Sequence, residues 1–96
     1  MKQYLISAQD FTDENAFERR MAARPAHLQT VKKLKSKDHY VIGGAMLNEE
    51  GKMIGSTMIV QFETPENLQE WLQNDPYITE KVWDRIEIKP FKVAEI

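Results

Sequence analysis

The sequence predicts an α+β fold with the element order β-α-β-β-α-β and one antiparallel sheet. Apolar residues alternate along four short segments, as they do in half-buried strands, and recur at helical spacing along two other segments. The 96-residue chain has material for one hydrophobic core, so we expect a single domain over residues 1–96. No linker rich in Pro, Gly or Ser divides it.

Composition excludes several classes of function. Thirteen Lys and Arg against 15 Asp and Glu leave a net charge of −2, which argues against nucleic acid as a partner. The absence of cysteine rules out a disulfide scaffold and a thiolate nucleophile, and fits a reducing cytoplasm. No apolar run approaches the roughly 18 residues of a membrane span, and the N-terminus lacks the features of a secretory signal. We expect a small soluble cytoplasmic protein with no membrane partner.

The first strand is predicted around residues 4–8. Tyr4, Ile6 and Ala8 fall on one face of this strand, and Leu5 and Ser7 fall on the other.

A long helix is predicted over Glu14–Ser36, because the apolar residues there recur every three or four positions. Pro25 interrupts this stretch. Since proline breaks a helix interior, we expect a bend there or the start of a second helix. The apolar positions at helical spacing are Phe17, Met21, Leu28, Val31 and Leu34.

Two further strands are predicted over His39–Leu47 and Ile54–Phe62. The loop Asn48–Lys52 joins them, and its Gly51 is free to adopt a positive φ. The first of these strands is apolar on both faces, with Tyr40, Ile42 and Met46 on one and Val41, Ala45 and Leu47 on the other.

The two-faced strand predicts an interface. A sheet with helices on one side only leaves its second face in water. Val41, Ala45 and Leu47, with Leu5 and Ile59, would form an apolar surface there, and full burial is worth about 1.5–3 kcal/mol for each large side chain. We expect a homodimer packed sheet to sheet. The alternative is a monomer whose termini shield this face.

A second helix is predicted to begin after Thr64. Thr64 can accept a backbone N–H, and Pro65 presets the backbone of the first turn. The helix ends near Asp75, because Pro76 pushes the residue before it out of the helical region, and Asp75 can cap a short further turn. The predicted buried stripe is Leu68, Trp71 and Leu72.

A last strand follows, with Val82, Ile86 and Ile88 on one face. Pro90 near its end predicts an edge position or a bulge, because proline has no N–H for a neighbouring strand. The complete element order is that of the ferredoxin-like fold.

His27 is the most interesting candidate for chemistry. Counting about 100° per residue, Val31 and Leu34 fall within about 40° of His27, which places it in the apolar arc that faces the sheet. Imidazole titrates near neutrality and suits acid–base work. The alternative is a buried histidine whose nitrogens bind backbone or water.

Asp75 and the Gly43–Gly44 pair each allow two interpretations. An aspartate before proline is typical of a cap or turn, yet it also supplies a carboxylate. Glycines inside an apolar strand indicate a bulge or a close approach, which leaves room for a ligand or for a packed helix. No glycine-rich phosphate loop is present, and the two histidines lack metal-ligand spacing, so we expect no metal and no cofactor.

Five segments of the sequence together resemble the YciI (YCII-related) family, and they run from the first strand to the last. The resemblance implies a ferredoxin-like domain that dimerises sheet to sheet as a dimeric α+β barrel. One departure is the short NEEGK loop, because some relatives carry a longer one between the second and third strands. The segments are Ser7-Ala8-Gln9-Asp10, Arg24-Pro25-Ala26-His27-Leu28, Gly44, Asp75-Pro76-Tyr77 and Lys89-Pro90-Phe91.

The resemblance also implies a histidine–aspartate centre in a pocket, which maps onto His27 and Asp75. Relatives are associated with elimination or dehydrochlorination on hydroxylated aromatic rings, so we expect a small cofactor-free enzyme, lyase- or isomerase-like. His27 would be the general base, Asp75 would hold its other N–H, and Arg24 would pair with a phenolate or carboxylate. The alternative is a non-catalytic ligand-binding or assembly module in which this pair only holds the pocket together. Further candidate binding residues are Ser7, Tyr77 and Gly44.

Overall fold

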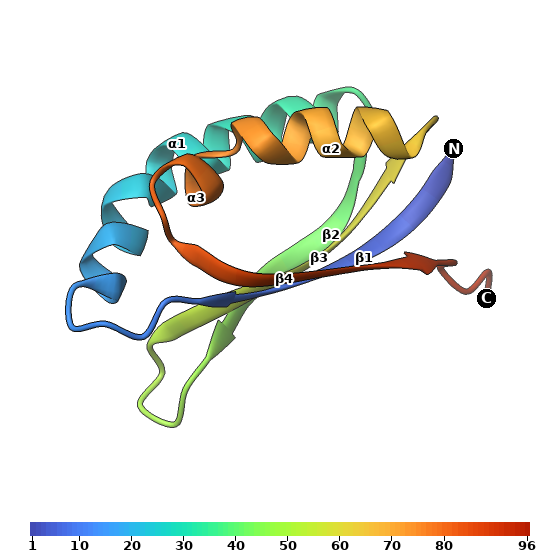
Figure 1. Cartoon of the computed structure of the whole chain (residues 1–96). Coiled ribbons are helices and arrows are strands. Elements are labelled where there is room, and N and C mark those ends of the chain that lie inside the picture. Colours follow the sequence, from blue (N-terminus) through green and yellow to red (C-terminus); the bar gives the residue numbers. More distant parts are fainter.

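Four antiparallel strands form one sheet in the order β2-β3-β1-β4, and every helix lies on the same face of it (Figure 1). This computed structural model describes residues 1–96 and confirms the ferredoxin-like order. None of its helices is long and apolar enough to cross a membrane. The elements are β1 (Lys2–Asp10), α1 (Ala16–Ser36), β2 (Tyr40–Leu47), β3 (Met53–Phe62), α2 (Pro65–Asn74), α3 (Pro76–Thr79) and β4 (Trp83–Phe91).

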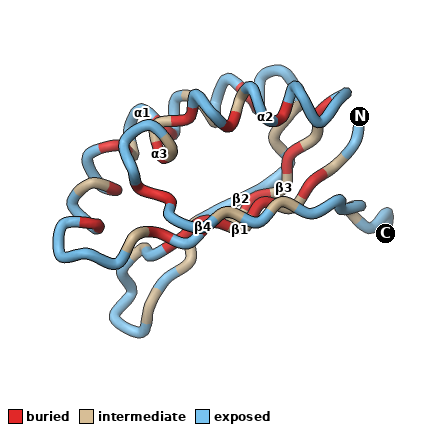
Figure 2. Tube along the Cα trace, in the orientation of Figure 1, coloured by how far each residue is buried: buried red, intermediate tan, exposed pale blue.

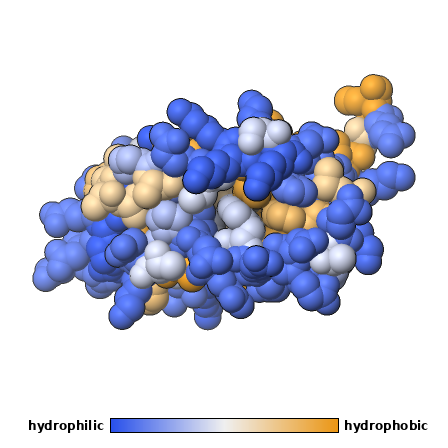
Figure 3. Space-filling view, turned by 90° about the horizontal axis from the view of Figure 1, so that it is seen from above, coloured by the Kyte–Doolittle hydropathy of each residue, from blue (hydrophilic) through white to orange (hydrophobic).

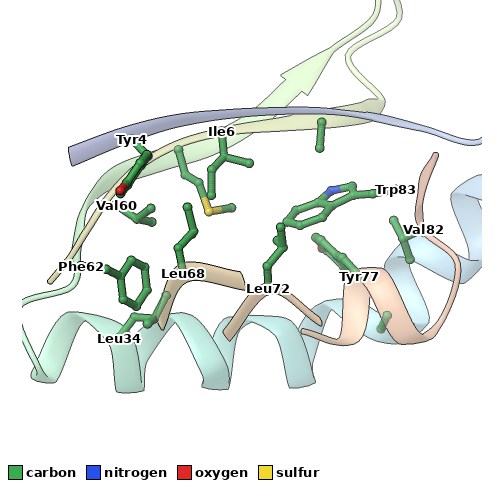
Figure 4. Close-up of a cluster of buried hydrophobic side chains, with 13 residues drawn as sticks. Tyr4, Ile6, Leu34, Val60, Phe62, Leu68, Leu72, Tyr77, Val82 and Trp83 are labelled. Atoms are coloured by element: carbon green, nitrogen blue, oxygen red, sulfur yellow. The ribbon is translucent and has the colours of Figure 1, made fainter. Parts of the chain in front are cut away.

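The core fills the space between the helices and the sheet face that they cover, which we call the inner face (Figures 2 and 4). On β1 the predicted alternation is confirmed: Tyr4, Ile6 and Ala8 are buried, and Leu5 and Ser7 lie on the opposite, outer face. Helix α2 contributes Leu68 and Leu72 to the core, whereas Trp71 of the same helix packs at the margin of the core. The hydrophobic effect therefore holds the helix layer on one side of the sheet.

Helix α1 is continuous from Ala16 to Ser36, so no new helix starts at Pro25. The helix instead arches over the sheet with Pro25 on its exposed side (Figure 1). Its buried face differs from the predicted stripe, because Phe17 and Met21 are 39% and 42% exposed. The residues that α1 buries are Ala16, Arg20, Ala23, His27 and Leu34.

A bulge near the start of β2 corrects the predicted faces of that strand. Tyr40 pairs with Val60, but Ile42 pairs with Ile59, so the register shifts between them. Tyr40 therefore lies on the inner face, while Ile42 moves to the outer face beside Ile59. Ala45, predicted for the outer surface, pairs with the buried Ser56 and lies on the inner side.

The expected helix ends are confirmed. The Thr64 hydroxyl accepts the backbone N–H of Asn67 at 3.2 Å, and the Asp75 carboxylate accepts that of Tyr77 at 2.9 Å, which caps α3. Gly51 has a φ of +82° in the β2–β3 loop. Strand β4 lies at the edge of the sheet, which confirms the edge position that Pro90 predicts.

Candidate functional site

A cavity of about 160 Å³ lies between α1 and the inner face of the sheet. Helix α1 forms one wall, β2 and β3 form the floor, and α3 contributes one aromatic ring. No Asp or Glu lines it. Its lining residues are Arg20, Arg24, His27, Leu28, Val31, Tyr40, Gly43, Gly44, Ala45, Ser56, Met58 and Tyr77.

His27 and Asp75 form a buried pair at this cavity. Nδ1 of His27 lies 2.8 Å from Oδ2 and 3.1 Å from Oδ1 of Asp75. His27 is 6% exposed and Asp75 is fully buried. Because an ionised carboxylate only accepts hydrogen bonds, the Nδ1 proton must point at Asp75. In the neutral imidazole this leaves the lone pair on Nε2, a nitrogen without a protein partner.

Asp75 has three kinds of donor. Besides His27, it accepts the Thr30 hydroxyl at 2.8 Å and the backbone N–H of Tyr77 at 2.9 Å. The Thr30 hydroxyl also lies 2.7 Å from the His27 carbonyl, so it ties the helix to the pair. Asp75 therefore caps α3 and orients His27 at the same time, and the two interpretations of this residue are compatible.

Aromatic rings fix the plane of the imidazole. The Tyr77 ring stacks on His27 with a centroid separation of 3.8 Å and an interplanar angle of 10°. Trp83 meets His27 edge-on at 5.8 Å. The guanidinium of Arg20 lies over the Tyr77 ring at 4.8 Å. Burial raises the pKa of the Tyr77 hydroxyl above its usual value, so Tyr77 is neutral at physiological pH.

Arg20 connects the site to the end of β1. Its Nη1 lies 2.9 and 3.0 Å from the two carboxylate oxygens of Asp10, and its Nη2 donates to the Ser56 hydroxyl at 2.8 Å. The Trp83 indole N–H donates to the same hydroxyl at 3.3 Å. Burial raises the pKa of Asp10, and Arg20 opposes that rise. The Arg20 charge is therefore compensated within the fold.

The floor of the cavity depends on Gly43. A Cβ built there would lie 2.5 Å from the Tyr40 hydroxyl and 2.7 Å from the Met58 Cβ. The missing side chain at Gly43 therefore allows the close approach that the glycine pair predicted. The Tyr40 hydroxyl occupies the space that a side chain at Gly43 would fill. A Cβ at Gly44 would meet no atom within 4 Å.

The structure brings most of the predicted site residues together. This cavity is lined by His27, Arg24, Tyr77 and Gly44 among others. Asp75 contacts His27 on the side of the imidazole away from the free Nε2. Ser7 is the exception: it lies on the outer face, where it pairs with Thr57 and Glu87, and its side chain does not reach the site.

Sequence reasoning missed Arg20, Tyr40 and Ser56 as lining residues. Arg20 carries no signal of burial in the sequence, because its partner Asp10 lies in another element. Tyr40 reaches the inner face only after the bulge is known. No group of three or more His, Cys, Asp or Glu side chains is arranged to hold a metal ion.

Solved structures share this fold. A 5-chloro-2-hydroxyhydroquinone dehydrochlorinase from Burkholderia phenoliruptrix AC1100, in complex with 2,5-dihydroxybenzoquinone, matches with a TM-score of 0.82 over 96% of this chain and 95% of its own, at 22% identity. A dimeric ferredoxin-like protein of unknown function from Jannaschia sp. CCS1 matches with a TM-score of 0.58 over 97% of this chain and 100% of its own, at 13% identity.

Curated sequences are more similar. Protein YciI of Escherichia coli O6:H1 is 37% identical over 93% of this chain and 95% of its own length. An uncharacterized protein of Haemophilus influenzae is 36% identical with the same coverage. The family model of the YCII-related domain matches residues 3–92, so the chain belongs to the YCII-related domain family.

Proposed function

We propose that this protein is a small acid–base enzyme, lyase- or isomerase-like, in which His27 is the general base. The observation that carries the proposal is the buried Nδ1–carboxylate contact of 2.8 Å between His27 and Asp75, at the wall of a cavity. Asp75 holds the imidazole in the tautomer whose Nε2 accepts a proton, and its negative charge stabilises the imidazolium that forms. A carboxylate in this position orients a histidine base and stabilises its protonated form.

The proposed reaction begins when Nε2 of His27 removes a proton from an acidified ring carbon or hydroxyl of the substrate. In a lyase, the electrons of that bond expel a leaving group such as chloride from the substrate, and the imidazolium then releases its proton to water. In an isomerase, the imidazolium returns the proton to another atom. Each course balances without a cofactor. The rings of Tyr77 and Trp83 exclude water from the imidazole and fix its plane.

The experiment compares wild-type protein with His27→Asn. A hydroxylated aromatic substrate is supported by the dehydrochlorinase of similar fold. Chloride release from 5-chloro-2-hydroxyhydroquinone is therefore the first assay. General-base loss should lower the rate by about 10²–10⁴-fold. If His27→Asn keeps the wild-type rate with an intact fold, the base assignment is wrong.

A second candidate function is a non-catalytic ligand-binding or assembly module. The contacts of Asp75 with Thr30 and with the backbone of Tyr77 favour it, because they give this carboxylate a structural task. In that case wild-type protein should release no chloride, and His27→Asn should only cost about 1–3 kcal/mol of stability. Thermal melting of the variant beside the rate assay separates the two functions.

We also propose that two copies pack through their outer sheet faces. The face of the helix layer is mostly hydrophilic (Figure 3), whereas the outer face holds Ile42, which is 63% exposed, beside Ile59 and Leu5. The dimeric neighbour of the same fold supports an assembly of two copies, and the exposed apolar side chains point to the outer face. Sedimentation should give a dimer for the wild type and for the control Met21→Glu on α1, and a monomer for Ile42→Glu. A wild-type mass near 11.2 kDa contradicts the proposal.

A further inference from the structure

The size of the cavity limits what it can hold. Its volume of about 160 Å³ is close to that of the engineered cavity of ~150 Å³ that accommodates benzene. One six-membered ring with a few substituents fits this space. A nucleotide or a larger cofactor would extend well beyond it.

The charges around the cavity favour an anion. Among the lining residues, Arg20 is compensated by Asp10, but Arg24 is half-buried and forms no salt bridge or hydrogen bond. Because no carboxylate lines the cavity, one positive charge is left for a ligand. Arg24 stands one helical turn before His27, and side chains three residues apart on a helix have Cβ atoms about 5–6 Å apart. That separation matches the span of one substituted ring.

A neutral donor lies on the floor of the cavity. The Tyr40 hydroxyl sits above Gly43, at the cavity floor, and has no hydrogen-bond partner in the protein. Burial raises its pKa, so the phenol stays protonated at neutral pH and can donate to a ligand oxygen.

We infer that the substrate is a ring-sized organic monoanion with a second oxygen, held by Arg24 at the charged group and by the Tyr40 hydroxyl at the second oxygen. This inference rests on the proposed function for the identity of the site. It adds the class of substrate and assigns Tyr40, which sequence reasoning did not find, to its recognition. Arg24 sets the preference for charge, and Tyr40 sets the preference for the additional oxygen.

Binding of simple probes tests the inference without any turnover. Benzoate and its neutral isostere benzamide are titrated into wild type, Arg24→Gln and the control Lys32→Gln, which removes an exposed charge from the same helix, and Kd is measured by NMR. Wild type and Lys32→Gln should bind benzoate about tenfold more tightly than benzamide, a ratio equivalent to about 1.4 kcal/mol. Arg24→Gln should lose that preference.

The second arm tests Tyr40. Wild type should bind 3-hydroxybenzoate more tightly than benzoate, and Tyr40→Phe should bind the two equally. The inference is overturned if wild type binds benzoate and benzamide equally, or binds neither at millimolar concentration. It is also overturned if Arg24→Gln still prefers benzoate to benzamide, or if Tyr40→Phe still binds 3-hydroxybenzoate more tightly than benzoate. His27-dependent turnover would then still support the proposed function, because these titrations involve no chemical step.

Discussion

The ion pair between Asp10 and Arg20 ties β1 to α1, and breaking it should destabilise the protein severely. Their side chains are only 6% and 3% exposed, with Nη1 of Arg20 2.9 Å from Oδ1 of Asp10. Asp10→Asn leaves the Arg20 charge buried without a counter-charge, which typically costs about 3–5 kcal/mol. Since a domain of this kind has about 5–15 kcal/mol of stability, the loss should be visible in a single urea titration.

The chain offers a matched control. Asp13 and Arg19 form a second pair at 2.7 Å with side chains 48% and 32% exposed, so Asp13→Asn should have a much smaller effect. Both variants are unfolded at one protein concentration, because a dimer's apparent stability depends on it. Replacing both buried charges, as in Asp10→Leu with Arg20→Met, should recover much of the loss. If Asp10→Asn lowers the free energy of unfolding no more than Asp13→Asn does, burial does not make the Asp10–Arg20 pair more important than the exposed one.

Two further predictions concern the cavity floor and acid stability. Gly43→Ala should lower the free energy of unfolding in urea by about 1–3 kcal/mol, because the added methyl group would overlap Tyr40 and Met58. The control Gly44→Ala should stay within about 1 kcal/mol of wild type. Similar losses in both variants would contradict the contacts at Gly43. The hydrogen bond from Arg19 lowers the pKa of Asp13 from 3.8 to about 2, so this pair stabilises the fold above pH 3.8 and the contribution disappears as the pH falls towards 2. Asp13→Asn should flatten that part of the acid-unfolding curve, and an unchanged slope would count against the pair.

Local sequence signals predicted the elements whose causes are local. The alternation of Tyr4, Ile6 and Ala8 placed β1 correctly, and Thr64 and Asp75 marked helix ends because their caps bind the next few residues. The two partners of each contact are only two or three residues apart, so both can be recognised in the same short stretch of sequence.

The features that sequence reasoning missed depend on distant partners. Arg20 can be buried because Asp10 and Ser56 accept its hydrogen bonds, and no residue near Arg20 in the sequence indicates these partners. The apolar Phe17 and Met21 looked more suited to the core but lie outside it. The bulge in β2 likewise moved side chains to the opposite sheet face from the one that strict alternation predicts. A shift of one residue in the strand register turns each following side chain to the other face.

In the proposed mechanism, His27, oriented by Asp75, removes a proton from a bound ring. Exchange of the ring hydrogens of 2,5-dihydroxybenzoquinone with D₂O, followed by proton NMR, tests this role with no leaving group. A ring carbon takes up a deuteron, and a base then removes the original proton from that carbon. Wild-type protein should accelerate the exchange, and His27→Asn, still folded and still binding benzoate, should be about 10²–10⁴-fold slower. Exchange that wild type does not accelerate, or that His27→Asn accelerates equally, would contradict this role of His27.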